Sequence, residues 1–428
     1  MTSKVVVWIA AVGKRRVVIR LDSGPAELMK TAGPKPFVCS LVPLRNWPPP
    51  EPVRHYGTAL LDHLLTCGDE SVRKAVGHVL DDSGTLYFYL EADTAELQSW
   101  EALCKQHFFT LKPDWCIARL VKPNVDPDYS PVPYQPPLRL LALMSAAKIE
   151  AAGEWQVLYK ASRDAAAAGL RIRLHLLAGE ETLVDQIRKE SKAKQKNLEL
   201  SVKPMPTLPV DVEHEINEFR PHLLHFFCHG QVRSGIRELR LADVNGWRKD
   251  ETFGMSVEML TSNEGVRGSW LIVINACKGA MAGEQMHSLT HALVAAGVPA
   301  AVGMMEQIDP LAANKFCEHF YPAVFNEIRS VSARLQKEEV GTGMELEWAS
   351  TMYEPRAALS QLYPSPFEAR QWTLPVLYMR RHGFKVRLTK PTAPKPPAED
   401  IRLDWLKLLP SDVTDRLTNL AGAAVLGK

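Results

Sequence analysis

The sequence predicts an α/β protein whose main domain is a doubly wound, mostly parallel six-stranded sheet with helices on both faces. Two observations support this fold class. Six short, almost uninterrupted apolar runs recur between residues 138 and 379, which is typical of strands buried on both faces. Longer amphipathic stretches separate these runs, and strands that alternate with helices form parallel sheets covered on both sides.

The individual elements follow from this rhythm. The runs LRLLALM, RIRLHLL, HLLHFFC, WLIVINA, VPAAVGM and LPVLYM predict strands at 138–144, 171–177, 222–228, 270–276, 298–304 and 374–379. Helical periodicity between them predicts helices at 154–168, 183–196, 288–296 and 311–329. Ahead of these, a mixed α/β region is predicted, with strands at 5–10 and 16–21 and helices at 56–67 and around 95–104.

Two proline-rich segments indicate the domain boundaries. The stretch KPNVDPDYSPVPYQPP, residues 122–137, contains six prolines, and proline fixes φ and removes a donor, so an extended connector is expected. A second segment, KPTAPKPPAED, precedes a predicted amphipathic helix near the C-terminus. We therefore expect an N-terminal regulatory or recruitment region at 1–122, a connector at 123–136, the main domain at 137–382, and a linker and helix at 383–428.

Composition argues against several classes of protein. The chain has 51 basic and 49 acidic residues, so no strong field favours nucleic acid or an anionic membrane. Its seven cysteines are scattered without a CxxC pair, which argues against a disulfide framework and a structural zinc site. No apolar run approaches the roughly 20 residues that span a bilayer. A reducing cytoplasm is the expected location.

The chemistry is expected where two predicted strands end. One run closes as LLHFFCHG and brings His229 and Gly230 to a strand end, and the next closes as LIVINACKG and brings Cys277 to another. Sites of open α/β sheets form outside the carboxyl ends of strands. If these strands are neighbours, an imidazole base lies beside a thiol nucleophile.

This pairing has a simple physical basis. A thiol with a pKa near 8.5 is only a few per cent thiolate at neutral pH, and an adjacent imidazole accepts its proton or stabilises the anion. Gly230 removes a side chain close to the reacting atoms. The main-chain N–H groups of Gly230 and Cys277 are the predicted oxyanion hole. His229 precedes Cys277 by 48 positions, close to the spacing in caspases.

The order of these motifs resembles that of CHAT domains. CHAT domains belong to the caspase-like clan of cysteine peptidases, together with separase, gingipains and metacaspases. The resemblance covers about residues 100–380 and rests on the blocks HFFCHG, RELRLAD, LIVINACKG, HALVAAGVPAAVGMMEQIDPLAANKFCEHFYPAV and LPVLYM. It implies a caspase-like fold and a catalytic dyad of His229 and Cys277, with Gly230 in the oxyanion hole.

The sequence also departs from the clan near the substrate. Several members carry Asp two residues before the catalytic cysteine, where it binds a basic P1 side chain, whereas this chain has Asn275. Strict Lys or Arg specificity is therefore not expected. Asn275, Glu306 and Asp309 are the candidate substrate-binding residues. For Asp309, which directly precedes Pro310, a helix N-cap is the alternative interpretation.

No metal or organic cofactor is expected. His222 and His225 fall on opposite strand faces by parity and are expected to be packed rather than to ligate a metal. The helical pair His287 and His291 lacks the glutamate of HExxH, and no GxGxxG or complete P-loop follows a strand.

The resemblance implies a cysteine endopeptidase that cleaves one or few partner proteins. Relatives act in prokaryotic antiviral defence and programmed cell death, are activated by a partner or ligand, and include gasdermin-like pore formers among their substrates. The alternatives are a catalytically idle CHAT-like scaffold and a ligand-sensing module.

Overall fold

The computed structural model describes most of the chain, namely residues 3–11, 17–24, 37–39, 53–91, 93–124, 128–193, 195–233, 236–277, 287–306, 308–339, 341–362, 364–365 and 370–389. The chain divides into a unit of residues 1–388 and a second unit of residues 389–428. The predicted linker at 390–400 and the helix after it lie outside the described residues. None of the described helices is long and apolar enough to cross a membrane.

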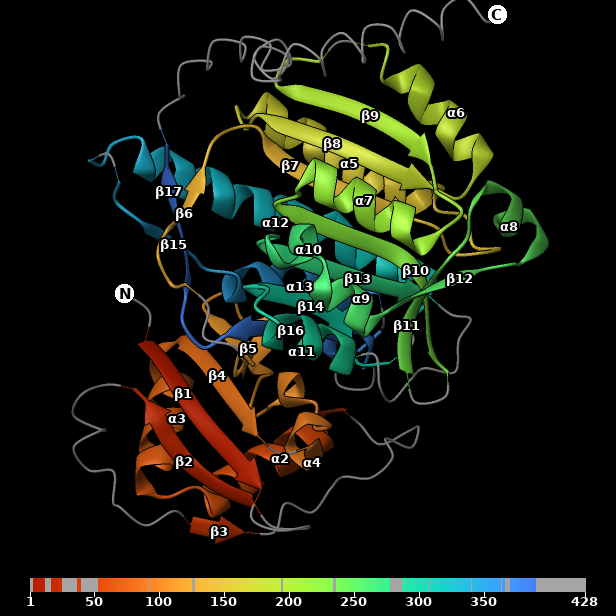
Figure 1. Ribbon diagram of the computed structural model, residues 1–428. Coiled ribbons are helices and arrows are strands. Elements are labelled where there is room, and N and C mark those ends of the chain that lie inside the picture. Colours follow the sequence, from red (N-terminus) through yellow and green to blue (C-terminus); the bar gives the residue numbers. More distant parts are fainter. Residues whose placement is uncertain are drawn as a thin grey trace, which may run out of the picture. The chain divides into compact units, whose positions relative to one another are not determined.

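All six predicted strands of the main domain are present, and the α/β fold class is confirmed (Figure 1). They are β7 (Leu138–Met144), β8 (Ile172–Ala178), β10 (Leu223–Arg233), β13 (Leu271–Cys277), β14 (Ala300–Met304) and β16 (Pro375–Arg380). Every pairing among them is parallel except that of β14 with β16. The burial of almost every residue in these strands explains their continuous apolar sequences.

The predicted number of six strands is wrong. A further parallel strand, β9 (Leu198–Pro204), pairs with β8 at the edge, in the order β16-β14-β13-β10-β7-β8-β9. Its sequence, LELSVKP, has exposed or half-buried residues after Leu198, because an edge strand does not need two apolar faces. Two short antiparallel strands, β11 (Ile236–Leu241) and β12 (Phe253–Ser256), extend from β10.

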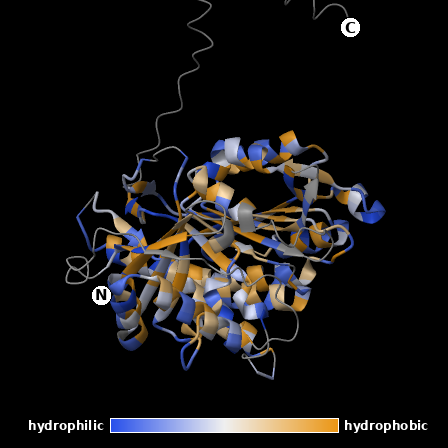
Figure 2. Ribbon diagram, turned by 90° about the horizontal axis from the view of Figure 1, so that it is seen from below, coloured by the Kyte–Doolittle hydropathy of each residue, from blue (hydrophilic) through white to orange (hydrophobic). Residues whose placement is uncertain are grey.

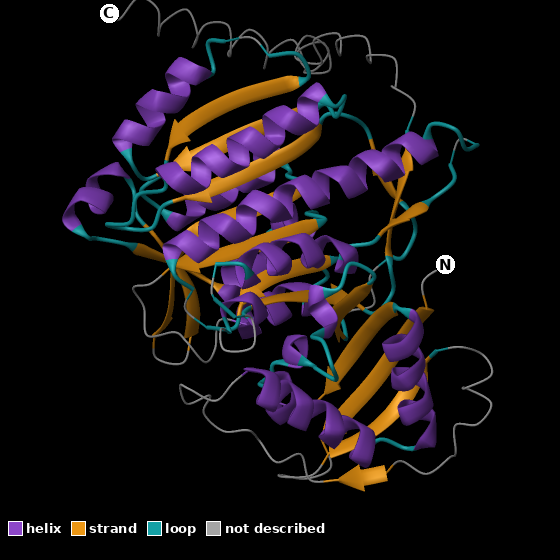
Figure 3. Cartoon of the chain, turned by 180° about the vertical axis from the view of Figure 1, so that it is seen from behind, coloured by secondary structure: helices purple, strands orange, loops and turns teal. Residues whose placement is uncertain are grey.

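Helices cover both faces of this sheet. The long α5 (Ala152–Ala167) and α12 (Pro310–Leu335) pack side by side on one face (Figure 3). The opposite face is covered by α7 (Pro209–Phe219), α9 (Val257–Ser262), α10 (Glu264–Arg267) and α11 (His287–Ala295). Figure 2 shows the strands as a mostly hydrophobic layer between the helices. In the same part of the chain, α6 (Glu181–Glu190) packs beside β8 and β9, and the short α8 (Val244–Lys249) lies between β11 and β12.

The strand order reverses between β7 and β10. From β7 the chain proceeds through β8 to β9 on one side, and then returns to β10, β13 and β14 on the other. Such a reversal separates the loops at the carboxyl ends of the two central strands and creates room for a ligand. Of the two predicted catalytic residues, His229 therefore lies on a strand next to the switch point, and Cys277 lies on the following strand, β13.

The N-terminal region extends the same sheet. Its strands are β1 (Ser3–Ala11), β2 (Val17–Ser23), β3 (Phe37–Cys39), β4 (Gly84–Glu91) and β5 (Trp115–Val121), accompanied by α2 (Val53–Cys67) and α3 (Glu70–Asp82). Because β5 pairs in parallel with β16, the strands before and after the connector belong to one 14-stranded sheet.

The predicted helix around residues 95–104 is wrong. The chain forms only a short α4 (Asp93–Glu96) and a 3-10 turn, η1 (Trp100–Ala102). The indole of Trp100 donates to the carbonyl of Ala95, and the Arg119 guanidinium donates to the carbonyls of Glu96 and Gln98. Side chains thus satisfy carbonyls that a continuous helix would satisfy internally.

The described residues of the predicted connector include a short strand, β6 (Val132–Tyr134). It pairs with β17 (Phe384–Leu388) in a separate three-stranded sheet with β15 (Met344–Leu346). The first residues of the predicted C-terminal linker are thus a strand. Short helices complete this part, namely η3 (Ala349–Met352), α13 (Tyr353–Ser360) and η4 (Gln371–Thr373).

Candidate active site

The two predicted catalytic positions lie directly opposite each other on neighbouring strands. Strands β10 and β13 are parallel, and their register pairs His229 with Cys277. Neighbouring strands lie about 4.8 Å apart, so the two backbones bring these positions within reach of a hydrogen bond between their side chains. The side chain of Cys277 lies outside the described residues.

Strand β10 changes partners at His229. Its pairing with β7 ends at Phe227, its pairing with β13 ends at His229, and its antiparallel pairing with β11 begins at His229. The strand continues to Arg233, five residues beyond the predicted end. The imidazole therefore projects from a continuous strand at the point where the flanking parallel strands stop.

A single hydrogen bond fixes the tautomer of His229. Its Nε2 lies 2.9 Å from the carbonyl oxygen of Ala147, in the loop between β7 and α5. A carbonyl oxygen only accepts, so Nε2 carries the proton, and in the neutral ring Nδ1 presents a lone pair. Nδ1 is buried and has no hydrogen-bond partner among the described residues. The ring is thus oriented with its basic nitrogen available.

Gly230 and Cys228 flank this imidazole and differ in their surroundings. Gly230 is buried and pairs with Leu239 of β11. Cys228 is fully buried on the opposite face of β10, in the apolar core with Phe226 and Ile274. Burial raises the pKa of the Cys228 thiol, so this second cysteine is a packed thiol rather than a nucleophile.

The structure gives each of the three candidate substrate-binding residues a partner within the chain. Asn275 is fully buried and donates from Nδ2 to Oε1 of Glu154 at 2.8 Å, so its expected contact with a substrate is not supported. Glu306 forms a bidentate ion pair with Arg370. Asp309 caps α12, since its Oδ1 accepts from the N–H of Leu311 at 2.7 Å, which is the alternative weighed from the sequence.

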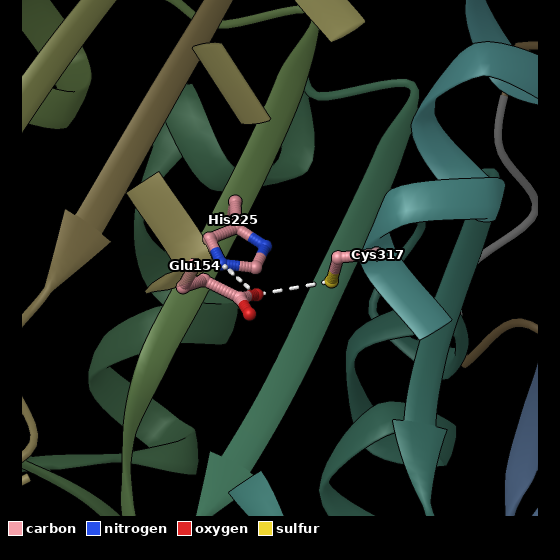
Figure 4. A group of neighbouring side chains, drawn as sticks. All are labelled: Glu154, His225 and Cys317. Carbon is pink, nitrogen blue, oxygen red and sulfur yellow. Dashed lines mark hydrogen bonds and ion pairs between the residues drawn. The ribbon is translucent and has the colours of Figure 1, made fainter. Parts of the chain in front are cut away.

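A cluster of buried polar side chains lies beneath the predicted dyad positions. This cluster was not predicted from the sequence. Glu154 of α5, His225 of β10 and Cys317 of α12 point toward one another (Figure 4). Asn275 of β13 joins them, and Tyr321 of α12 makes a 2.7 Å hydrogen bond with Nδ1 of His225. All five side chains are almost completely buried.

One sequence signal was available for this cluster. Strand side chains alternate between faces, so His225 lies on the same face of β10 as His229, and Asn275 on the same face of β13 as position 277. Polar residues at these positions indicate a polar patch beneath the strand ends. Glu154 and Cys317 have no short-range ligand spacing to either strand, so their arrival depends on the packing of α5 against α12.

Comparison with known proteins shows what part of the chain is similar to a known family. The family model of the CHAT domain matches residues 134–341, and no curated protein matches the chain. Among matching solved structures is a chain of the Saccharomyces cerevisiae separase–securin complex, at 10% sequence identity and a TM-score of 0.33. That match covers 75% of this chain but only 17% of the other. The resemblance to the CHAT domain that the sequence indicates is thus supported by the family model over residues 134–341.

Proposed function

We propose that the chain is a cysteine endopeptidase in which His229 is the general base and Cys277 the nucleophile. The observation that carries the proposal is the register of β10 and β13, which pairs these two positions at the ends of adjacent parallel strands. The orientation of His229 supports it, because the Ala147 carbonyl holds Nε2 and leaves Nδ1 without a partner among the described residues.

The proposed reaction has two stages. Nδ1 of His229 accepts the proton of the Cys277 thiol, and the thiolate attacks the scissile carbonyl carbon. The imidazolium then donates this proton to the leaving amine as the tetrahedral intermediate collapses to a thioester. Water hydrolyses the thioester with His229 again as the base, which releases the acid and restores the thiol.

The Ala147 carbonyl has a defined part in this scheme. When His229 becomes an imidazolium, its Nε2–H still donates to this oxygen, so the charged ring keeps an acceptor and its orientation. A backbone carbonyl thus does what a third side chain does in a Ser-His-Asp triad. Main-chain N–H groups of Gly230 and Cys277 are the proposed donors to the oxyanion.

We infer the substrate class and the context from the resemblance to CHAT peptidases. The proposed substrates are one or few partner proteins, with gasdermin-like pore formers among the candidates, in a prokaryotic defence or programmed-death pathway. The N-terminal region is the proposed receiver of an activating partner or ligand. The pairing of β5 with β16 of the main domain supports this proposal.

Labelling with a thiol-reactive peptidyl probe tests the catalytic assignment. The wild-type protein is expected to be labelled on Cys277, the Cys277→Ala variant to lose this labelling, and a Cys228→Ala variant to keep it. Cys228 is a matched control, since it lies one residue from His229 but is buried on the opposite face. Equal labelling of wild type and Cys277→Ala would contradict the assignment.

Cleavage in cells tests the substrate proposal and separates the enzyme from an idle scaffold. Proteins encoded beside this chain are co-expressed with the wild type or with Cys277→Ala, and cleavage products are sought by mass spectrometry. We expect a product with the wild type, a smaller yield with His229→Ala, and none with Cys277→Ala. A product that persists in the Cys277 variant would point to another nucleophile.

A further inference from the structure

The buried cluster of Glu154, His225 and Cys317 takes no part in the proposed reaction, and the chemistry of its side chains points to another role. We propose that these three residues bind a divalent transition-metal ion of the zinc class. These three residues lie inside the core rather than at the dyad positions, so the proposed metal site does not depend on the peptidase assignment.

The ligand types and their spacing suit such an ion. Thiolate sulfur, imidazole nitrogen and carboxylate oxygen are the ligands that Zn²⁺ commonly takes in proteins. Sγ of Cys317 lies 3.0 Å from Oε1 of Glu154, and Nε2 of His225 lies 3.2 Å from the same oxygen. All three ligand atoms lie within 4.8 Å of one another. A tetrahedron with bonds of about 2.0–2.3 Å has edges of about 3.3–3.8 Å, so modest adjustments bring these atoms around one ion.

The hydrogen bonding of the cluster is incomplete without a further partner. Oε2 of Glu154, Nε2 of His225 and Oδ1 of Asn275 are all buried and make no hydrogen bond with the described residues. Nε2 of His225 is near enough to Glu154 for an ion pair but fails the geometry of a hydrogen bond. Buried polar atoms are rarely left in this condition, and a cation between the three side chains supplies the partner that Nε2 of His225 lacks.

The hydroxyl of Tyr321 gives His225 the outer hydrogen bond that metal-bound histidines commonly have. Tyr321 lies 2.7 Å from Nδ1 of His225, and when Nδ1–H donates to this hydroxyl, the lone pair of Nε2 points toward Glu154 and Cys317. Such an outer hydrogen bond commonly fixes the tautomer of a ligating histidine. Asn275 provides an amide oxygen as a fourth ligand after rotation of its side-chain amide, whose two ends are assigned only from hydrogen bonds.

Charge also favours an ion at this place. The described partners of the Glu154 carboxylate are an amide, a thiol and an imidazole, none of which carries a permanent positive charge. A carboxylate buried without a cation is costly. Binding of Zn²⁺ with release of the Cys317 thiol proton to solvent gives two anionic ligands, one neutral ligand and a net charge of zero in the core.

The proposed ion fastens three elements beneath the dyad. Its ligands come from α5, β10 and α12, and His225 lies on the same strand face as His229. We therefore expect a structural ion that stabilises the strand ends, rather than an ion that polarises the substrate. Removing it should lower the unfolding temperature even in a protein that lacks the catalytic thiol.

The test uses the full chain with Cys277→Ala, so that the proposed nucleophile cannot bind the metal. Protein purified with a reductant and without chelator is analysed for metal content, and is also reconstituted with Co²⁺, whose bond to a thiolate gives charge-transfer absorption in the near ultraviolet. We expect about one ion per chain, a cobalt–thiolate band, and a lower unfolding temperature after chelation.

Variants locate the site. Adding Cys317→Ala should abolish the band and the bound ion, and Glu154→Gln, which keeps the shape of the side chain, should weaken retention at least about tenfold. Adding Cys228→Ala removes a buried thiol outside the cluster and should change neither the cobalt band nor the bound ion.

The proposal is overturned if no metal is found before or after reconstitution, or if Cys317→Ala and Glu154→Gln retain the metal. Should Cys317→Ala fail to fold, Glu154→Gln with the cobalt spectrum decides. Probe labelling of Cys277 in the wild-type protein tests the peptidase assignment separately. The metal site and the peptidase assignment can therefore fail independently of each other.

Discussion

At the scale of single residues, His222 makes the stability of the sheet depend on pH. Its ring stacks on Trp270 at a centroid distance of 4.2 Å, and its Nδ1 accepts from the N–H of Arg139 at 3.1 Å. Burial, together with the nearby positive charge of Arg139, holds the pKa of His222 well below 6.5. The folded protein therefore keeps this histidine neutral.

The sign of the pH effect follows from linkage. Below about pH 6.5 the unfolded chain binds a proton at His222 that the folded chain does not, so the free energy of unfolding falls by up to about 1.4 kcal/mol per pH unit. His175, whose pKa is also lowered by burial, acts in the same direction. In urea unfolding between pH 5 and 8, His222→Asn should reduce the slope of the unfolding free energy against pH. The reduction should be up to about 1.4 kcal/mol per pH unit, which corresponds to one proton. An unchanged slope would mean that His222 is protonated in the folded protein.

The pairing of positions 229 and 277 was predictable at this scale, and the polar interior was not. His229 and Cys277 sit at the ends of apolar runs, so parallel strand order alone brings them together. The partners of Asn275 and Glu306 within the chain were not predictable, because a polar residue near a strand end has two possible destinations. Burial beneath α5 and α12 gave Asn275 a partner in Glu154, and Arg370, far away in the sequence, gave one to Glu306.

At the scale of elements, the close approach of α11 to β14 depends on Gly303. A Cβ atom at this position would lie 2.6 Å from Cγ2 and 2.9 Å from Oγ1 of Thr290 in α11. Gly303→Ala should therefore push the helix away from the strand and lower the free energy of unfolding by about 1–3 kcal/mol. Since β14 pairs with β13, which carries Cys277, probe labelling should also slow.

A double-mutant cycle checks this packing. Thr290→Ala removes both atoms that the new methyl group would meet, so the cost of Gly303→Ala should be smaller in the Thr290→Ala background, with a coupling of about 0.5 kcal/mol or more. As a control, Gly77→Ala in α3 places a methyl group where no atom lies within 4 Å. Strictly additive free energies in the cycle would show that the helix and strand are not in tight contact.

Elements were predictable where their apolar pattern was complete. Strands buried on both faces, such as β7 and β13, have continuous apolar runs and were located to within a residue or two. The edge strand β9 was missed because its alternating sequence, LELSVKP, lacks such a run. The failed helix near residue 100 had a helical composition, but tertiary hydrogen bonds from Arg119 and Trp100 replaced its internal ones.

At the scale of the whole molecule, a buried ion pair lies where β5 of the N-terminal region meets β16. Arg119 of β5 and Glu101 are both fully buried and 2.8 Å apart. The same guanidinium reaches Sδ of Met305 at 3.3 Å and lies over the ring of Tyr378 in β16. Glu101→Ala leaves this charge unpaired inside the protein, and should cost about 3–5 kcal/mol in the free energy of unfolding.

The continuous sheet makes a stronger prediction about the proposed domain boundary. Deleting residues 1–122 removes β5 and converts β16 from an interior strand, fully buried along its length, into an open edge. Exposed apolar edge strands pair with other chains, so the fragment 123–428 should aggregate or unfold at a markedly lower temperature than the full chain. Size-exclusion chromatography and thermal unfolding measure both outcomes.

The matched control ends the chain after residue 389. This control keeps every strand pairing of the 14-stranded sheet and should change the unfolding temperature little. A monomeric 123–428 fragment as stable as the full chain would mean that β5 only rests against β16, and that the connector separates two independent folding units.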